Sequence, residues 1–166
     1  SYSGLVDINT KDYITFDGFE VRNSNDFCIR AIAGTGIEFK NTSVHGNTTN
    51  EGGTDSNRSG ILFREITNGL IQSCTAYDTG LHGIDVQSCT NTDIDLNIVY
   101  ANPNGKGINL IVTTTDSQTE FDGNTVTRNT LSGVTDGLYV RYQTNMVISN
   151  NLIYETTNHG IHFDVD

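Results

Sequence analysis

The chain has 166 residues, of which 35% are hydrophobic, and it carries a formal net charge of −11 at pH 7. This charge argues against a nucleic-acid-binding protein, which needs a basic face to displace counterions from phosphates. No apolar run approaches the roughly 20 residues that cross a bilayer, so no membrane span is expected.

A short phrase recurs along the chain, in which a turn residue, usually glycine, precedes residues that alternate between apolar and polar. From residue 60 onward the glycines of this phrase fall 23 to 30 residues apart. Alternation of this kind indicates strands with one buried face and one solvent-exposed face. The copies begin at Gly4, Asp26, Gly60, Gly83, Gly107, Gly137 and Gly160.

A second phrase follows about ten residues after each copy of the first and holds two strand-like stretches around a small or amide residue. Each repeat therefore predicts three strands and three turns, and no segment has the sustained 3.6-residue period of a helix. Stacked repeats predict a triangular solenoid of about seven coils without a capping helix. The second phrase occupies residues 14–21, 37–44, 70–77, 94–100 and 147–154.

Amide side chains recur at the bend inside the second phrase. Stacked inward amides can satisfy the backbone groups of a bend and one another, so an asparagine ladder is expected there. Gly18 and Cys74 should interrupt this ladder, and the coil around Asn97 is offset by one residue from its neighbours. The predicted ladder residues are Asn41, Asn97, Asn124 and Asn151.

The phrases Gly-Ile-x-Val and Ile-x-Phe-x-Gly/Asn, which recur over the whole chain, resemble those of right-handed parallel β-helix proteins of the pectate-lyase-like superfamily. This resemblance implies an all-β, right-handed parallel β-helix. The superfamily includes polysaccharide lyases, polygalacturonase-type hydrolases, alginate epimerases and phage tailspikes. The expected function is therefore to bind or process a polysaccharide, in particular one that contains uronates, outside the cell or at its surface.

Residues 1–166 are expected to form one β-helix domain. Neither end carries an amphipathic helix that would cover exposed strands, so the sequence predicts a fragment or stacking unit of a longer solenoid. Adjoining coils, or copies of the same chain, are then possible partners through the open ends. The competing function is a non-catalytic solenoid such as an adhesin, fibre or surface-layer segment, and a third reading is a carbohydrate-binding face without turnover.

In the superfamily, the working face is the solvent side of the strand that follows the glycine. Outward residues of successive coils should form two columns about 4.8 Å apart from coil to coil. The first column is predicted to hold Cys28, Leu62, Asp85, Asn109, Tyr139 and His162. The second is predicted to hold Arg30, Arg64, Gln87, Ile111, Arg141 and Asp164.

Two patches on these columns carry candidate chemistry. Acid–base chemistry on a uronate needs a base, a proton donor and a group that neutralises the carboxylate. The catalytic candidates are Tyr139, Arg141, His162 and Asp164 in one patch, and His82, Asp85 and Arg64 in the other. The substrate-binding candidates are Asn109, His159 and Gln87.

Each patch also has a structural explanation. Arg141 and Asp164 are neighbours in a column and could form a cross-coil ion pair of small value. His82 and His159 both precede a glycine, so their position can be explained by the repeat sequence as well as by a function.

Other chemistries find less support. Asp85 and Asp164 should lie roughly 14 Å or more apart, beyond the roughly 5–10 Å of paired glycosidase carboxylates. Lys11, Lys40 and Lys106 fall outside the strand columns, which weakens any transfer of a lysine base from the superfamily's lyases.

Metal ligands are not evident from spacing. Cys28, Cys74 and Cys89 show no metal-ligand pattern and are expected to be buried structural residues. No metal site is predicted from this spacing, and the alternative is Ca²⁺ bound near one of two pairs of aspartates. These pairs are Asp93 with Asp95, and Asp12 with Asp17.

Overall fold

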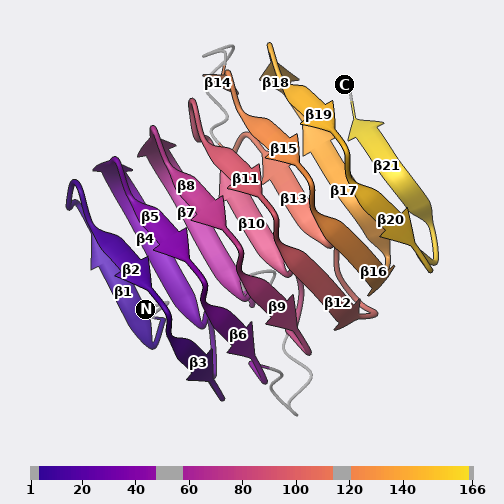
Figure 1. Ribbon diagram of the computed structural model, residues 1–166, viewed down its shortest axis with the longest axis horizontal. Helices are drawn as coiled ribbons and strands as arrows, with labels where there is room; N and C mark the ends of the chain where they lie inside the picture. Colours follow the sequence, from indigo (N-terminus) through magenta and orange to yellow (C-terminus); the bar gives the residue numbers. More distant parts are fainter. Residues whose placement is uncertain (1–3, 48–57, 114–120, 165–166) are drawn as a thin grey trace.

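The computed structural model describes residues 4–47, 58–113 and 121–164. Within these ranges all regular elements are β-strands, which confirms the predicted all-β class, and no helix is long and apolar enough to cross a membrane. The strands wind into a solenoid whose coils follow one another from one end to the other (Figure 1). All pairings between strands are parallel, as a β-helix requires.

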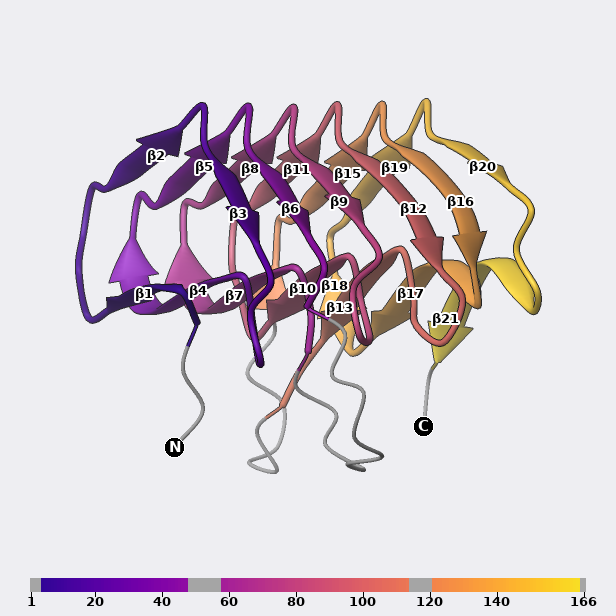
Figure 2. The same ribbon diagram turned by 90° about the horizontal axis from the view of Figure 1, so that it is seen from below.

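One seven-stranded sheet contains the strand that follows the glycine of each repeat. It runs along one side of the solenoid, and the two remaining long sheets form the other sides (Figure 2). Its strands are, in spatial order, β1 (Val6–Asn9), β4 (Ile29–Thr35), β7 (Ile61–Thr67), β10 (Ile84–Gln87), β13 (Ile108–Ile111), β17 (Asp136–Arg141) and β21 (His159–Asp164).

Two six-stranded sheets hold the strands of the second phrase. The first consists of β2 (Thr15–Asp17), β5 (Glu38–Lys40), β8 (Leu70–Gln72), β11 (Asp93–Asp95), β15 (Thr125–Thr127) and β19 (Val147–Ser149). The second consists of β3 (Glu20–Arg22), β6 (Ser43–His45), β9 (Thr75–Tyr77), β12 (Ile98–Asn102), β16 (Thr130–Val134) and β20 (Leu152–Tyr154). A small sheet pairs β14 (Phe121–Asp122) with β18 (Gln143–Thr144).

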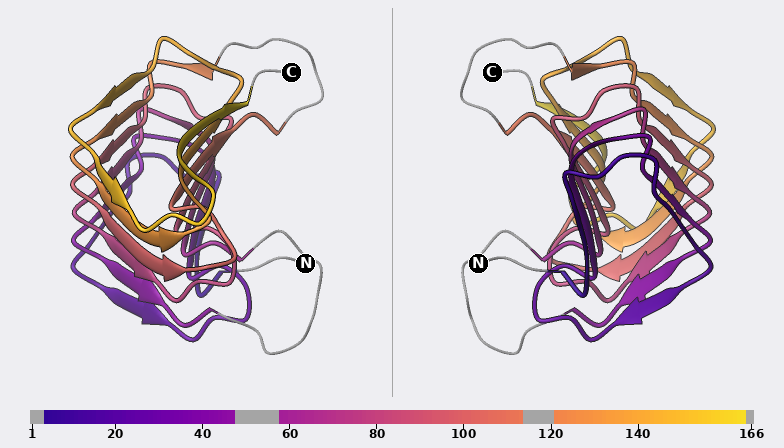
Figure 3. Two further views of the ribbon diagram at one scale, coloured as in Figure 1. Left: turned by 90° about the vertical axis from the view of Figure 1, so that its right-hand side faces the viewer. Right: turned by 90° about the vertical axis from the view of Figure 1, so that its left-hand side faces the viewer.

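The core is a column of apolar side chains inside the coils. Figure 3 shows the coils that enclose it end-on. Ile94 pairs with Ile71 on one side and Val126 on the other, and all three are fully buried. Each fully buried side chain of this kind contributes roughly 1.5–3 kcal/mol relative to an exposed one. The alternating burial along each strand therefore accounts for the repeat that the sequence displays.

The predicted asparagine ladder is present, although its membership differs. Asn97, Asn129 and Asn151 stack at one bend, where each Nδ2 donates to the next Oδ1 at 3.0 Å. Cys74 interrupts the ladder as predicted, and its backbone N–H donates to Oδ1 of Asn97 at 2.9 Å. Asn97 is therefore in register with its neighbours, and the predicted one-residue offset is wrong.

Two predicted ladder residues lie elsewhere. Asn41 is exposed with φ of 49°, so Thr42 occupies the buried position of that coil. The residue before each ladder position adopts this left-handed conformation, which asparagine tolerates well, and the prediction mistook the turn residue for the ladder residue. Asn124 belongs to a different bend, where its Oδ1 accepts the backbone N–H of Thr92 at 2.9 Å.

The register of β4 also differs from the prediction. Arg30 lies opposite Leu62, in the first column, and Ile32 lies opposite Arg64, in the second. Cys28 belongs to neither column, because it is the buried residue that occupies the place of Gly60 in the next coil. Alignment on Asp26 shifted the prediction by two residues.

Candidate functional site

The outward face of the seven-stranded sheet presents the predicted columns from β7 onward. In the first column, Asp85 pairs with Leu62 and Asn109, Asn109 with Tyr139, and Tyr139 with His162. In the second, Gln87 pairs with Arg64 and Ile111, and Arg141 with Asp164. The alternation of the strands therefore places these side chains on one surface.

The two predicted patches meet in a single pocket of about 290 Å³. It crosses strands β7, β10, β13 and β17, so it runs along the solenoid axis. Of the predicted site residues, His159, His162 and Asp164 do not line it and lie on β21 beside it. The pocket is lined by Arg64, His82, Asp85, Gln87, Lys106, Asn109, Ile111, Thr113, Tyr139 and Arg141.

The charge of the pocket is opposite to that of the chain. Arg64, Lys106 and Arg141 line it together with one carboxylate, Asp85, whereas the whole chain has nine basic and 20 acidic residues. Asp85 is 1% exposed, so it presents little of its charge to solvent. The pocket is therefore a local cationic feature on an acidic solenoid.

Asp85 holds the floor of the pocket together. Its Oδ1 accepts a hydrogen bond from Nδ2 of Asn109 at 2.8 Å, and its Oδ2 accepts one from Nε2 of Gln87 at 2.7 Å. Burial raises the pKa of Asp85, while the hydrogen bonds from Asn109, Gln87 and Ser59 and the charge of Arg64 oppose this. Such a carboxylate suits the positioning of the two amides.

The same network extends to the cationic residues on both sides. Nε of Arg64 donates to Oε1 of Gln87 at 2.8 Å. Nζ of Lys106 donates to Oδ1 of Asn109 at 3.3 Å. Both cations are thereby tied, each through one amide, to the carboxylate of Asp85, which orients them without neutralising them directly.

Lys106 is the residue that sequence reasoning passed over. It lies in the bend before β13, outside the strand columns, but its Nζ lies 3.3 Å from the centroid of the Tyr139 ring. Burial lowers the pKa of Lys106, and the carboxylates of Asp136, Asp85 and Asp164 oppose this shift. The sequence signal that could have identified Lys106 as a site residue is its position directly before a glycine, which it shares with His82 and His159.

Tyr139 connects the pocket to the last strand. Its hydroxyl donates to the carboxylate of Asp164, and its ring meets the His162 ring edge-on with centroids 5.1 Å apart. Arg141 Nε lies 3.8 Å from Asp164 Oδ2, which confirms the cross-coil ion pair. Both side chains are partly solvated, so this pair contributes little to stability.

His82 lines the pocket as a neutral imidazole. Its Nδ1 accepts the backbone N–H of Lys106 at 3.1 Å, which leaves the ring proton on Nε2. Burial, with a further contribution from the charge of Lys106, lowers the pKa of His82 to about 3.

This shift predicts a loss of stability in mild acid. The folded-state pKa of about 3 lies below the ordinary 6.5. The unfolded chain therefore takes up a proton as pH falls below about 6.5, while the native state does not, and unfolding becomes more favourable. Between pH 7 and pH 5, His82 should remove about 2 kcal/mol from the free energy of unfolding. Urea denaturation at the two pH values measures this loss.

His82→Gln keeps a hydrogen-bond acceptor but cannot titrate, so its free energy of unfolding should fall less over the same interval. His45→Gln is the matched control, because His45 lies on β6 with its ring stacked on Tyr77. Equal pH dependence in the wild type and in His82→Gln would contradict the expectation.

Comparisons with known proteins identify a family, a relative in sequence and a solved structure of the same fold. A family model described as right handed beta helix region matches residues 2–135 and 54–166. The capsule K1-specific depolymerase of Klebsiella phage K64-1 is 26% identical over 133 residues, which is 71% of this chain and 15% of the depolymerase. The chain therefore corresponds to a small part of that relative.

A solved structure shares the fold. The A-module of the Azotobacter vinelandii mannuronan C-5 epimerase AlgE6 superposes with a TM-score of 0.64 and 16% sequence identity. The match covers 93% of this chain and 44% of that module. At this identity the likeness is one of fold, and it confirms the predicted parallel β-helix.

Proposed function

Because the chain belongs to the right-handed β-helix family, we propose that its cationic pocket binds a uronate-containing polysaccharide and carries out acid–base chemistry on it. The observation that carries this proposal is the gathering of Arg64, Lys106 and Arg141 around one pocket of an acidic chain. The relatives support it, since they are named as a capsule depolymerase and a mannuronan epimerase. The same proposal places the protein outside the cell or at its surface.

Electrostatics favours an anionic ligand at this place. A polyanion approaching a protein of charge −11 is repelled unless a local cationic groove attracts it. Guanidinium groups bind carboxylates through two parallel hydrogen bonds, and Arg64 and Arg141 lie at opposite ends of the pocket, on β7 and β17. The four strands under the pocket span about 14 Å, enough for a short stretch of a sugar chain.

The pocket also contains the groups that an elimination on a uronate requires. Lys106, in the fraction of molecules whose amine is unprotonated, takes the proton from C5. The electron pair of that bond forms the C4–C5 double bond, and the bond from C4 to the glycosidic oxygen breaks. The phenol of Tyr139 protonates the departing oxygen, and an arginine balances the charge that develops on the carboxylate. The lowered pKa of Lys106 raises the fraction of neutral amine at neutral pH.

A panel of acidic and neutral polysaccharides, each incubated with and without Ca²⁺, tests this function. We expect ultraviolet absorbance from unsaturated uronates on at least one acidic polymer. New reducing ends without that absorbance would indicate hydrolysis and would contradict the assigned roles. Binding without either signal would indicate a carbohydrate-binding protein without catalysis. The absence of binding would favour a structural solenoid.

A further inference from the structure

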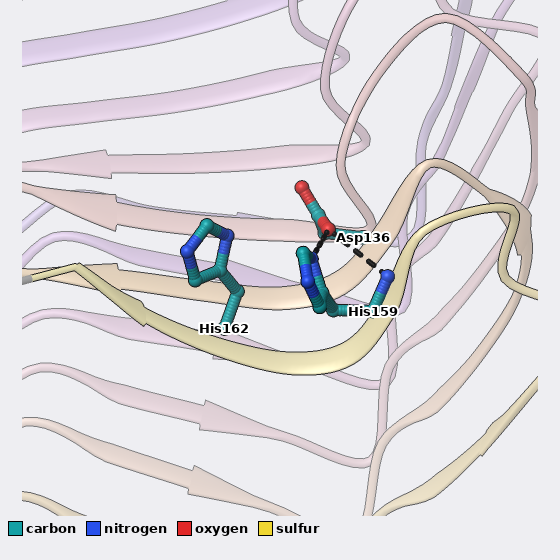
Figure 4. A group of neighbouring side chains, drawn as sticks. All are labelled: Asp136, His159 and His162. Atoms are coloured by element: carbon teal, nitrogen blue, oxygen red, sulfur yellow. Dashed lines mark hydrogen bonds and ion pairs between the residues drawn. The ribbon is translucent and has the colours of Figure 1, made fainter.

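Three metal-ligating side chains meet at the edge of the seven-stranded sheet, beside the pocket. Asp136 is on β17, and His159 and His162 are on β21, as Figure 4 shows. One ligand atom from each lies within 4.8 Å of the other two. His159 Nδ1 lies 2.9 Å from Asp136 Oδ1, and the centroids of the two imidazole rings are 4.5 Å apart.

Two of these groups suit a bound cation. Oδ1 of Asp136 accepts the backbone N–H of His159 at 3.2 Å, which fixes the carboxylate beside the two imidazoles. Nδ1 of His162 is buried and has no hydrogen-bond partner among the described residues. A buried polar atom without a partner is costly, and a bound ion would remove that cost.

We propose that Asp136, His159 and His162 bind a divalent transition-metal ion, with Zn²⁺ as the fitting member of the class. Two imidazoles and one carboxylate form a ligand set that zinc uses when one position remains open, whereas Ca²⁺ requires six to eight oxygens. Ligand atoms of a tetrahedral zinc site lie roughly 3.4 Å apart for bonds of about 2.1 Å. The 2.9 Å between His159 Nδ1 and Asp136 Oδ1 is close to this spacing, and the proposal requires His162 to rotate toward these two atoms.

The surroundings support the ligand set. Nδ2 of Asn158 donates to Oδ1 of Asp136 at 3.0 Å, which orients the carboxylate in the way that outer groups orient metal ligands. Sequence spacing predicted no metal here, because Asp136 comes from the preceding coil and only the stacking of β17 on β21 brings it to the histidines. The ion would lie near Tyr139, whose ring contacts His162, and so at one end of the pocket.

Calorimetric titration of the chelator-treated protein with ZnCl₂ tests the site independently of any polysaccharide. We expect one Zn²⁺ per chain, and an affinity at least about tenfold weaker in His159→Gln and in His162→Gln, because even the loss of an outer group that orients a ligand weakens metal binding about tenfold or more. Co²⁺ should give visible absorption bands in the wild type that His162→Gln loses. Asp136 also accepts hydrogen bonds from Asn158 and from the backbone of His159, which order the bend before β21, so the histidine variants carry the test.

His45→Gln is the matched control, because His45 also faces a carboxylate, with Nε2 3.1 Å from Glu20 Oε1. This variant should bind Zn²⁺ as the wild type does. Circular dichroism establishes that every variant is folded. The absence of a stoichiometric site in the folded wild type, or an unchanged affinity in His162→Gln, would overturn the proposal. Because the readouts are heat and absorbance, they do not depend on whether the pocket turns over a substrate.

Discussion

Replacement of Lys106 by methionine is expected to lower kcat/KM on a uronate polysaccharide at least about 100-fold, because a positioned base contributes that much or more. Methionine keeps an unbranched apolar stem against Tyr139 but removes the amine that lies over its ring. The variant also removes one of the three cations of the pocket. The initial rate of unsaturated-uronate formation measures the loss.

Lys106→Arg separates the two contributions of the lysine. Arginine keeps the positive charge but does not give up its proton, so KM should stay near the wild-type value while kcat falls. Lys40→Met is the control, because Lys40 lies on β5 and pairs with Glu38 at 2.9 Å, on a different sheet. Retention of kcat in Lys106→Arg would show that the lysine acts through its charge alone.

The fold could be predicted because local and global patterns agree in most coils. Ile84 and Val86 point inward, and Asp85 and Gln87 point outward, as strict alternation requires. The same alternation assigned both outward columns from residue 61 onward. The prediction of register failed at β4, where Cys28 stands in the place that glycine takes in later coils. Without that glycine, the prediction aligned the strand on the wrong turn residue.

The site was harder to predict than the fold, because it depends on lengths of side chains that a column pattern ignores. Lys106 starts in a bend, yet its long side chain reaches the ring of Tyr139 on the next coil. This reach joins two patches that sequence reasoning treated separately. Asp136 and His159, which lie opposite each other, both precede a glycine. The alternation begins only after that glycine, so it does not predict where these two side chains point.

Replacement of Asn129 by leucine is expected to lower the free energy of unfolding by about 3–5 kcal/mol, because it removes a buried amide with several partners. Asn129 is 1% exposed. Its Oδ1 accepts the backbone N–H of Asn97 at 2.9 Å, and its Nδ2 donates to the carbonyl of Ile94 at 2.9 Å. Leucine has nearly the same volume but takes away the acceptor of the Asn97 backbone N–H and the amide donor to the Ile94 carbonyl.

Urea denaturation measures the change, and Asn104→Ala is the control because Asn104 is exposed in a turn. The control should stay within about 0.5 kcal/mol of the wild type. A loss below 1 kcal/mol in Asn129→Leu would show that the bend satisfies its backbone without the ladder. A large loss would mean that the ladder keeps adjacent coils in register, and coil register is what holds Tyr139 over the pocket beside Asn109. The amides of the bend would then stabilise the geometry of the opposite sheet.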